Sequence, residues 1–455
     1  MTPSPFLAEA LRAARETHAL EIGENILDRA PEMFREQFGD QPAVIVTDPN
    51  TFTVAGEKVA AAFRQAGRAM LEPFIFRAPD LYAEERFVAE LETALRSHAA
   101  VPVAIGSGTI NDLTKLAAHR TGRSYLCVAT AASMDGYTAF GASITADGLK
   151  QTFFCPAPAA VLADLKIICG APGDMNSWGY ADLLAKVTAG ADWILADALG
   201  VEPIDAQAWS IVQSRLREMI ADPAGVKARD PAAIRHLVEG LMLGGFAMQA
   251  TKSSRSASGA EHQFSHLWDM QHHTHRGQAP SHGFKVGIGS LASTALYEQL
   301  LAQPLDRLDV ESCCAAWPEE SVWPQRAEKL LGKGELLEGA IRELRAKHSS
   351  VEQLRAQLEK LRATWPGLRE KLRAQLLPLA TLKKMLGDAG APTEPEEIGI
   401  TRERLRESYA QAFCIRRRFT VLDFAVRAGR LECSLDQIFG PNGLWPVKKT
   451  LPAVP

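Results

Sequence analysis

The segment VPVAIGSGTIND, residues 101 to 112, joins an apolar run to a glycine-containing turn. The run from Val101 to Ile105 predicts a buried strand, and residues 111–119 predict a helix. A strand that leads through glycines into a helix leaves backbone N–H groups at the helix N-terminus, where the helix dipole favours a pyrophosphate. The third glycine of the dinucleotide fingerprint is missing, so a plain structural turn is an equal interpretation.

A second strand, residues 43–46, runs into Asp48. An acidic residue after an early strand of a nucleotide-binding fold can accept hydrogen bonds from the adenosine ribose. Such a carboxylate also disfavours a 2′-phosphate, which favours NAD over NADP. A helix N-cap or an Asx turn is the alternative interpretation for Asp48, and it is favoured on the sequence alone.

A third strand, residues 125–128, is followed by Thr130, Ser133 and Asp135. Small and hydroxyl-bearing residues let a flat ring lie against the backbone, and a carboxylate just beyond can hydrogen-bond a substrate hydroxyl. Three successive strand ends therefore carry chemistry suited to a ligand, and together they favour a nucleotide site over a simple turn.

Strands that alternate with helices from about residue 40 to 170 indicate βαβ units and a parallel sheet. After Pro172 helical periodicity dominates. We therefore predict an α/β, Rossmann-like nucleotide-binding domain over residues 1–170 and an all-α domain over residues 171–455. Leucines at heptad-like steps over residues 354–372 favour a helical pair packed on its own domain over a dimerising coiled coil, with Pro366 interrupting the run.

Composition excludes several classes of protein. The 455 residues include 50 Lys and Arg against 54 Asp and Glu, with no long basic run, so nucleic acid is not an expected partner. The sequence contains no run of about 18 uncharged apolar residues, which a membrane span would require, and its first residues lack a secretory pattern. We therefore expect a cytoplasmic location. The seven cysteines are odd in number and form no Cys-x-x-Cys pair, which fits neither a disulfide framework nor a zinc knuckle.

Six of the 11 histidines lie between residues 262 and 282. His262 and His266 are four residues apart, which places both imidazoles on one helical face. The zinc-protease motif requires Glu directly after the first His, and Gln263 occupies that place, so a metalloprotease is disfavoured. The cluster predicts a metal site.

A divalent ion bound by two imidazoles also requires a carboxylate, and Asp182 is the best candidate. A helix-start role is the equal alternative for Asp182. His282 precedes a helical pattern of small apolar residues, whereas His272, His273 and His275 lie in a polar stretch and are interpreted as loop residues.

These motifs occur in an order that resembles the iron-containing alcohol dehydrogenase and dehydroquinate synthase superfamily, most closely its glycerol-1-phosphate dehydrogenases. The matching blocks are Gly106-x-Gly108-x-x-x-Asp112-x-x-Lys115, Thr130-Ala-Ala-Ser133-x-Asp135-Gly136, Ala181-Asp182-Leu-Leu-Ala-Lys186, Gly259-Ala-Glu-His262-x-x-Ser-His266, His282-Gly-x-Lys-Val-Gly287 and a tail at residues 416–423.

The resemblance implies a nucleotide-binding domain, a helical domain and a catalytic cleft between them. It implies a substrate-facing role for Asp135 and His266, and one divalent ion held by Asp182, His262 and His282, with zinc first and nickel or iron as alternatives. It further implies NAD or NADP held by Asp48, Gly106, Gly108, Thr109, Ile110, Asn111, Asp112, Thr130 and Ser133.

Two residues depart from the family's pattern. Ala139 stands near a position where relatives often have a cofactor-contacting Ser, and Phe284 stands where smaller or polar residues are usual. Lys252 and Arg255 are candidates for binding a substrate phosphate, with solvent-facing roles as the favoured alternative. A homodimer or larger homo-oligomer is expected.

The leading hypothesis is hydride transfer between sn-glycerol 1-phosphate and dihydroxyacetone phosphate by a metal-dependent NAD(P)-linked dehydrogenase. The alternatives are a dehydrogenase of another polyol, a dehydroquinate-synthase-like lyase on the same site, and a nucleotide sensor without turnover.

Overall fold

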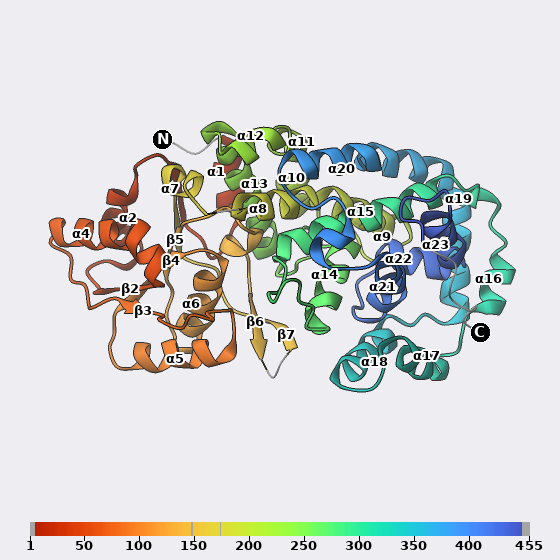
Figure 1. The fold of residues 1–455 in the computed structure, drawn as a ribbon, viewed down its shortest axis with the longest axis horizontal. Coiled ribbons are helices and arrows are strands. Elements are labelled where there is room, and N and C mark those ends of the chain that lie inside the picture. The colour runs from red at the N-terminus through yellow and green to blue at the C-terminus, as the bar shows by residue number, and fades with distance from the viewer. Residues whose placement is uncertain (1–4, 147–148, 173, 448–455) are drawn as a thin grey trace. The chain divides into compact units, whose positions relative to one another are not determined.

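A computed structural model describes residues 5–146, 149–172 and 174–447 (Figure 1). The chain forms two compact units. Unit 1 takes the chain up to Leu184, together with Asp205–Ala257 and Asp388–Ala391. Unit 2 takes Ala185–Ile204, Ser258–Gly387 and the chain from Pro392 onward.

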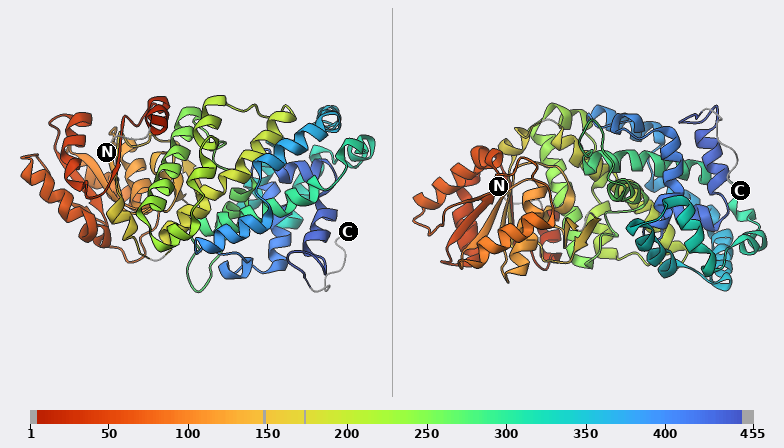
Figure 2. Two further views of the ribbon diagram at one scale, coloured as in Figure 1. Left: turned by 90° about the horizontal axis from the view of Figure 1, so that it is seen from above. Right: turned by 60° about the horizontal axis from the view of Figure 1, so that its bottom comes forward.

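Unit 1 is built on a six-stranded parallel sheet, whose strands lie side by side in the right-hand view of Figure 2. The order is β1 (Ala19–Gly23), β8 (Ala160–Asp164), β5 (Leu126–Ala129), β4 (Val101–Gly106), β2 (Ala43–Thr47) and β3 (Phe74–Ile75). Every residue of β2, β4, β5 and β8 is buried. Continuous apolar strands of this kind belong in a parallel sheet covered on both faces.

The three predicted strands are confirmed as β2, β4 and β5, and their register fixes where the polar strand ends meet. Val46 pairs with Ala104, and Gly106 pairs with Ala129. The residues that follow these strands therefore leave the sheet at the same edge, which is where ligands of parallel sheets bind.

Helices cover the sheet. Phe34 of α2 (Ala30–Phe38) and Phe63 of α4 (Glu57–Gln65) share one buried cluster with Ile45 and Val103 of the strands. α6 (Gly108–Arg120) contacts β2 and β4, and α5 (Glu85–Arg96) packs on α6. The helix predicted over residues 111–119 thus begins earlier, at Gly108, and ends at Arg120.

The rest of unit 1 is a hairpin and a group of helices. The antiparallel hairpin pairs β6 (Ala142–Ala146) with β7 (Leu149–Phe153). The main helices are α1 (Pro5–Ala13), α7 (Leu165–Cys169), α8 (Met175–Leu184), α10 (Ala206–Gln213), α11 (Leu216–Met219), α12 (Pro223–Ala228) and α13 (Pro231–Thr251), with short 3-10 turns η1 (Leu27–Arg29) and η3 (Asp135–Thr138).

The helix α13 contacts α1, α8 and α10, so these helices are part of the unit that holds the sheet. The boundaries of the two compact units therefore differ from the predicted domain boundary at residue 170. The predicted functional division, with cofactor binding before residue 170 and metal binding after it, stays a prediction.

Unit 2 is helical, as predicted for the later part of the chain, and its described residues form no strand beyond the single bridge between His275 and Gln278. Its main helices are α9 (Lys186–Ala198), α14 (Ala260–Met270), α15 (His282–Leu301), α16 (Val310–Ala316), α17 (Trp323–Leu331), α18 (Glu335–Lys347), α19 (Val351–Gln375), α20 (Leu379–Asp388, whose last residue belongs to unit 1), α21 (Arg402–Cys414), α22 (Val421–Arg427) and α23 (Leu431–Phe439).

A buried carboxylate joins four of these helices. Asp192 of α9 accepts hydrogen bonds from Ala260 N at 2.7 Å, Val421 N at 2.8 Å and the Tyr297 hydroxyl at 2.6 Å. These donors lie at the starts of α14 and α22 and on α15. Because a desolvated carboxylate is costly without partners, the four elements are held in one arrangement.

The heptad-like leucines lie on α19, and all of them are buried together with Trp365. α19 packs against α9, α16 and the turn η4 (Leu305–Arg307), so the apolar seam is covered within unit 2, as predicted. The expected interruption at Pro366 is wrong, because α19 runs through it as one helix of 25 residues. Burial of the leucines on both sides of the proline offsets the lost backbone hydrogen bond.

Two predictions from composition can be compared with the described residues. All seven cysteines lie in the described ranges, and all are free thiols. No helix in those ranges is long and apolar enough to cross a membrane.

Burial of the α19 leucines predicts that a substitution at a buried position of this helix lowers stability, whereas one at an exposed position does not. Leu361→Ala removes a side chain with 0% exposure and should lower the free energy of unfolding by about 2–5 kcal/mol, through lost burial and a residual cavity. Glu359→Ala, at an exposed position of the same helix, should stay within about 0.5 kcal/mol of wild type. Equal denaturant midpoints for the two variants would contradict this packing of α19.

Candidate active site

The turn after β4 has the geometry of an anion cradle. Gly106 ends the strand, and α6 begins two residues later at Gly108. Within the described part of the chain, the Ser107 side chain makes no capping hydrogen bond at this helix start. A Cβ at Gly106 would lie 2.5 Å from Cβ of Ile110, so glycine is required there. The first N–H groups of α6 therefore have no side-chain cap at the edge where ligands bind.

The side chains after this turn face the protein. Ile110 and Asn111 are buried, and Asn111 accepts a hydrogen bond from the Tyr125 hydroxyl at 2.9 Å. Asp112 accepts from Ser143 N at 3.2 Å, and Thr109 is half-buried. A cofactor at this turn would thus be held by backbone groups, while the side chains fix the turn itself.

Asp48 has the helix-capping role that the sequence alone favours. Its carboxylate accepts from Asn50 N at 2.9 Å and Thr51 N at 3.1 Å, and from the Thr51 hydroxyl at 2.8 Å. Thr51 in turn accepts from Asp48 N, which completes a capping box at α3 (Pro49–Thr51). The side chain is half-buried, so this cap leaves part of it accessible.

Three predicted site residues, Thr130, Ser133 and Asp135, lie on the segment 130–141. Thr130 and Ser133 are buried. Thr130 N donates to the Gly106 carbonyl at 3.1 Å, which joins this segment to the glycine turn. The Ser133 hydroxyl lies 3.4 Å from the Tyr137 hydroxyl. The predicted cofactor residues of β4 and β5 are thus adjacent within unit 1.

Lys115 fixes the second half of this segment, a role that the sequence reasoning missed although the residue lies within a family motif. Its buried ammonium donates to the carbonyls of Gly136, Ala139 and Gly141 at 2.8, 3.0 and 3.0 Å. Three carbonyls around one buried cation leave the turn little freedom. Ala139 contributes its backbone to this arrangement, and its side chain is buried beside Met248 and Ala257.

Helix α8 contacts the segment 130–141 through its residues 176, 179 and 182. Asn176 accepts from Ala132 N at 3.2 Å, and Asp182 accepts from Asp135 N at 3.0 Å. Between them, a Cβ at Gly179 would lie 1.9 Å from the Ala132 carbonyl oxygen. Asp182 is completely buried in the last turn of α8, so the alternative of a helix-start residue is wrong.

The two candidates for a phosphate site differ in exposure. Lys252 is exposed at the C-terminal end of α13, in the left-handed conformation with φ 49°. Arg255 is 2% exposed. The solvent-facing alternative therefore applies to Lys252 and does not apply to Arg255.

Three of the clustered histidines come together in unit 2. His262 and His266 lie one turn apart on α14, and His282 is the first residue of α15. The ring centroids are separated by 5.2 Å for His262 and His282, 6.2 Å for His262 and His266, and 6.0 Å for His266 and His282. Gly289 permits this approach, since a Cβ there would lie 2.4 Å from the Glu261 carbonyl oxygen.

Glu261 is a site residue that the sequence reasoning did not single out. Its Oε1 lies 2.9 Å from Nδ1 of His262, and its side chain is fully buried. Burial opposes ionisation, but the hydrogen bonds from His262 and the backbone outweigh it and lower the pKa of Glu261. Because a carboxylate only accepts hydrogen bonds, Nδ1 of His262 donates the proton in this contact.

The other three clustered histidines are loop residues, as predicted. His272, His273 and His275 lie between α14 and α15. The ring of His273 contacts the Ile398 carbonyl at 2.7 Å and the Arg404 guanidinium at 2.8 Å, so its role is structural. Phe284, in the first turn of α15, is half-buried.

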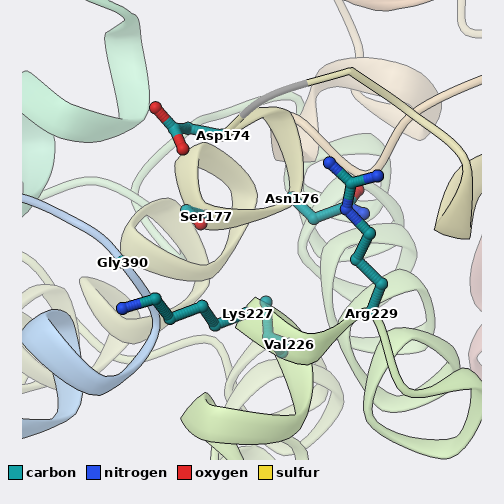
Figure 3. Close-up of a pocket in the computed structure, with 7 residues that line it drawn as sticks. All are labelled: Asp174, Asn176, Ser177, Val226, Lys227, Arg229 and Gly390. Carbon is teal, nitrogen blue, oxygen red and sulfur yellow. The ribbon is translucent and has the colours of Figure 1, made fainter.

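A separate cavity of about 350 Å³ lies in unit 1 at the start of α8 (Figure 3). It is lined by Asp174, Asn176, Ser177, Val226, Lys227, Arg229 and Gly390. Lys227 and Arg229 are exposed, and none of the predicted site residues lines this cavity.

The residues present fit the metal ion and the dinucleotide cofactor that the sequence implies. Neutral imidazoles are suitable ligands for zinc, nickel or ferrous iron, and two of the three rings are held at Nδ1, His262 by Glu261 and His282 by Ser265. An uncapped helix start beside an obligatory glycine suits a pyrophosphate.

Comparisons with known proteins agree with this chemistry. A family model described as iron-containing alcohol dehydrogenase matches residues 21–172. A glycerol-1-phosphate dehydrogenase (NAD(P)+) of Halalkalibacterium halodurans is 36% identical over 287 residues, which cover 62% of this chain and 71% of that protein. One of Methanosarcina mazei is 32% identical over 276 residues, covering 61% and 75%.

A similar fold occurs in the crystal structure of glycerol dehydrogenase from Schizosaccharomyces pombe. The TM-score is 0.59 at 16% sequence identity, with 92% of this chain and 90% of that chain covered. This likeness supports the predicted fold, a Rossmann-like domain followed by a helical domain.

The close approach of α8 to residue 132 can be tested with two alanine substitutions. Gly179→Ala must displace backbone and should lower the free energy of unfolding by at least about 2 kcal/mol. Gly367→Ala, in α19 with nothing within 4 Å of its Cβ, should raise it by up to about 1 kcal/mol through helix propensity. Chemical denaturation followed by circular dichroism measures both, and an unchanged Gly179→Ala midpoint would contradict the contact.

Proposed function

The chain belongs to the iron-containing alcohol dehydrogenase family, and we propose that it interconverts sn-glycerol 1-phosphate and dihydroxyacetone phosphate with NAD(P) and a divalent ion. The observation that carries the proposal is the group of three imidazoles on α14 and α15 in a chain 36% identical to a glycerol-1-phosphate dehydrogenase. When bound, NAD(P) accepts the hydride from the carbon that bears the hydroxyl, and the ion lowers the pKa of that hydroxyl.

Unit 1 would hold the cofactor. The N–H groups at Gly108, Thr109 and the following residues of α6 would bind the pyrophosphate, and Thr130 and Ser133 would lie along the ring. Asp48 would accept from the ribose hydroxyls. Its negative charge disfavours a 2′-phosphate, so we propose NAD as the preferred cofactor.

Asp182, His262 and His282 would hold the ion, with zinc as the first choice and nickel or ferrous iron as alternatives. The hydrogen bond from Asp135 N to Asp182 would orient the carboxylate before an ion binds. His262 and His282 would each bind through Nε2.

The remaining residues would handle the substrate. Asp135 would accept a hydrogen bond from a substrate hydroxyl, which orients the carbon that loses the hydride. His266, half-buried beside the other two imidazoles, would take the hydroxyl proton during oxidation and return it during reduction. Arg255 is the stronger candidate for the substrate phosphate because it is an arginine held inside the protein.

Reduction of dihydroxyacetone phosphate tests the proposal directly. Metal-reconstituted protein should oxidise NADH on adding this ketone, and chelation should abolish the reaction. His262→Ala and Asp182→Ala should each lower kcat/KM by more than about 100-fold, because each removes a ligand of the ion.

The matched control is His119→Ala, an exposed histidine on α6, which should keep wild-type turnover. Full activity of Asp182→Ala would overturn the assigned ligand set. Absence of turnover with the ketone phosphate, while NADH still binds tightly, would overturn the assigned substrate.

Asp48 has two separable roles, one in capping and one in cofactor choice. Asp48→Ser retains a good N-cap residue but removes the charge, so the thermal midpoint should stay near wild type. The ratio of kcat/KM for NADPH to that for NADH should rise by about tenfold, because repulsion of the 2′-phosphate is lost. Steady-state kinetics with both cofactors measures this ratio, and an unchanged ratio would leave Asp48 a cap alone.

A further inference from the structure

We propose that Glu261 is the positioning residue for the metal ligand His262, and that it sets the affinity of the site for a divalent ion. This inference rests on the proposed function, because it assumes that His262 binds an ion. Glu261 itself would not touch the ion or the substrate.

Glu261 and His262 are consecutive residues at the start of α14, where neighbouring side chains ordinarily diverge. Here Oε1 of Glu261 reaches Nδ1 of His262 at 2.9 Å and also accepts from Gly259 N at 2.5 Å. One carboxylate oxygen thus joins the imidazole to the backbone before the helix. The ring is held through Nδ1, and Nε2 would be its ligand atom.

The second oxygen of Glu261 anchors the carboxylate to another helix. The Thr188 hydroxyl of α9 lies 3.0 Å from Oε2 and 2.9 Å from the Ala185 carbonyl, so its one proton is shared between these two acceptors. A Cβ at Gly259 would lie 2.9 Å from this same oxygen and 2.4 Å from Oδ2 of Asp192. The carboxylate therefore has donors on both oxygens and little room for another rotamer.

A negative charge on the far nitrogen raises the basicity of a ligand imidazole as well as orienting it. Nδ1 of His282 lies 3.3 Å from the Ser265 hydroxyl, which is a neutral group. A neutral hydroxyl supplies less charge than a carboxylate, so we expect His262 to depend more strongly on Glu261 than His282 depends on Ser265.

Binding of Co²⁺ alone, without cofactor or substrate, tests the inference. The dissociation constant is measured by competition with a chelator, and the visible absorption spectrum of the bound ion reports its coordination. Glu261→Gln should raise the dissociation constant by at least about tenfold. Ser265→Ala should raise it by less, and Glu335→Gln, an exposed glutamate on α18, should leave it unchanged.

A second variant covers the case in which Glu261→Gln does not fold. Thr188→Val leaves the carboxylate and its contact with His262 in place but removes the donor to Oε2, so it should weaken Co²⁺ binding and alter the spectrum. Thermal melting of each metal-free variant shows whether it is folded.

The outcomes separate the inference from the proposed function. Wild-type affinity and an unchanged spectrum in folded Glu261→Gln and Thr188→Val would overturn the role of Glu261 and leave the metal site standing. Failure of the wild-type protein to bind Co²⁺ would overturn both. Weakened binding in Glu261→Gln with normal binding in Glu335→Gln would support the inference.

Discussion

Carboxylates that accept hydrogen bonds from main-chain N–H groups fix the segments on which the site depends. In unit 1, Asp182 holds the backbone of Asp135. In unit 2, Asp192 holds the first residue of α14, and Glu261 holds the residue just before it. Each of these three carboxylates is fully buried, so the cost of an unpaired charge opposes any other arrangement. These polar contacts fix the backbone at points where apolar packing alone would allow one segment to shift along its neighbour.

Much of the fold could be predicted from local patterns. The buried runs of β2, β4 and β5 are continuous and apolar, and the helix after Gly108 follows a turn that only glycine permits. The outer strands were missed because β3 is two residues long and β1 joins β8, about 140 residues away in sequence. Register between distant strands depends on tertiary contacts that no local window contains.

The sequence predicts those parts of the candidate site in which residues of one type cluster along the chain. It does not reveal residues whose hydrogen-bond partners are distant in the sequence. The histidines of α14 and α15 lie within 21 residues of one another, so their spacing carries information. Glu261 looks like an ordinary helix-start acid until the Thr188 contact is seen. Lys115 looks like a surface lysine, because its three acceptors are carbonyls and a sequence does not show where carbonyls point. The continuation of α19 through Pro366 has the same origin, since burial along the whole helix outweighs the local penalty.

The division of the chain between the units has a consequence for its synthesis. Residues 388–391 belong to unit 1, and Ser177 donates to the Ala389 carbonyl at 2.6 Å. The sheet and its strand-end loops are made early, yet the unit that contains them is complete only after residue 391 of 455 has left the ribosome. Neither unit is a contiguous stretch, so no single truncation isolates either one. The contact between Ser177 and Ala389 can form only after a segment more than 200 residues further along the chain has been made.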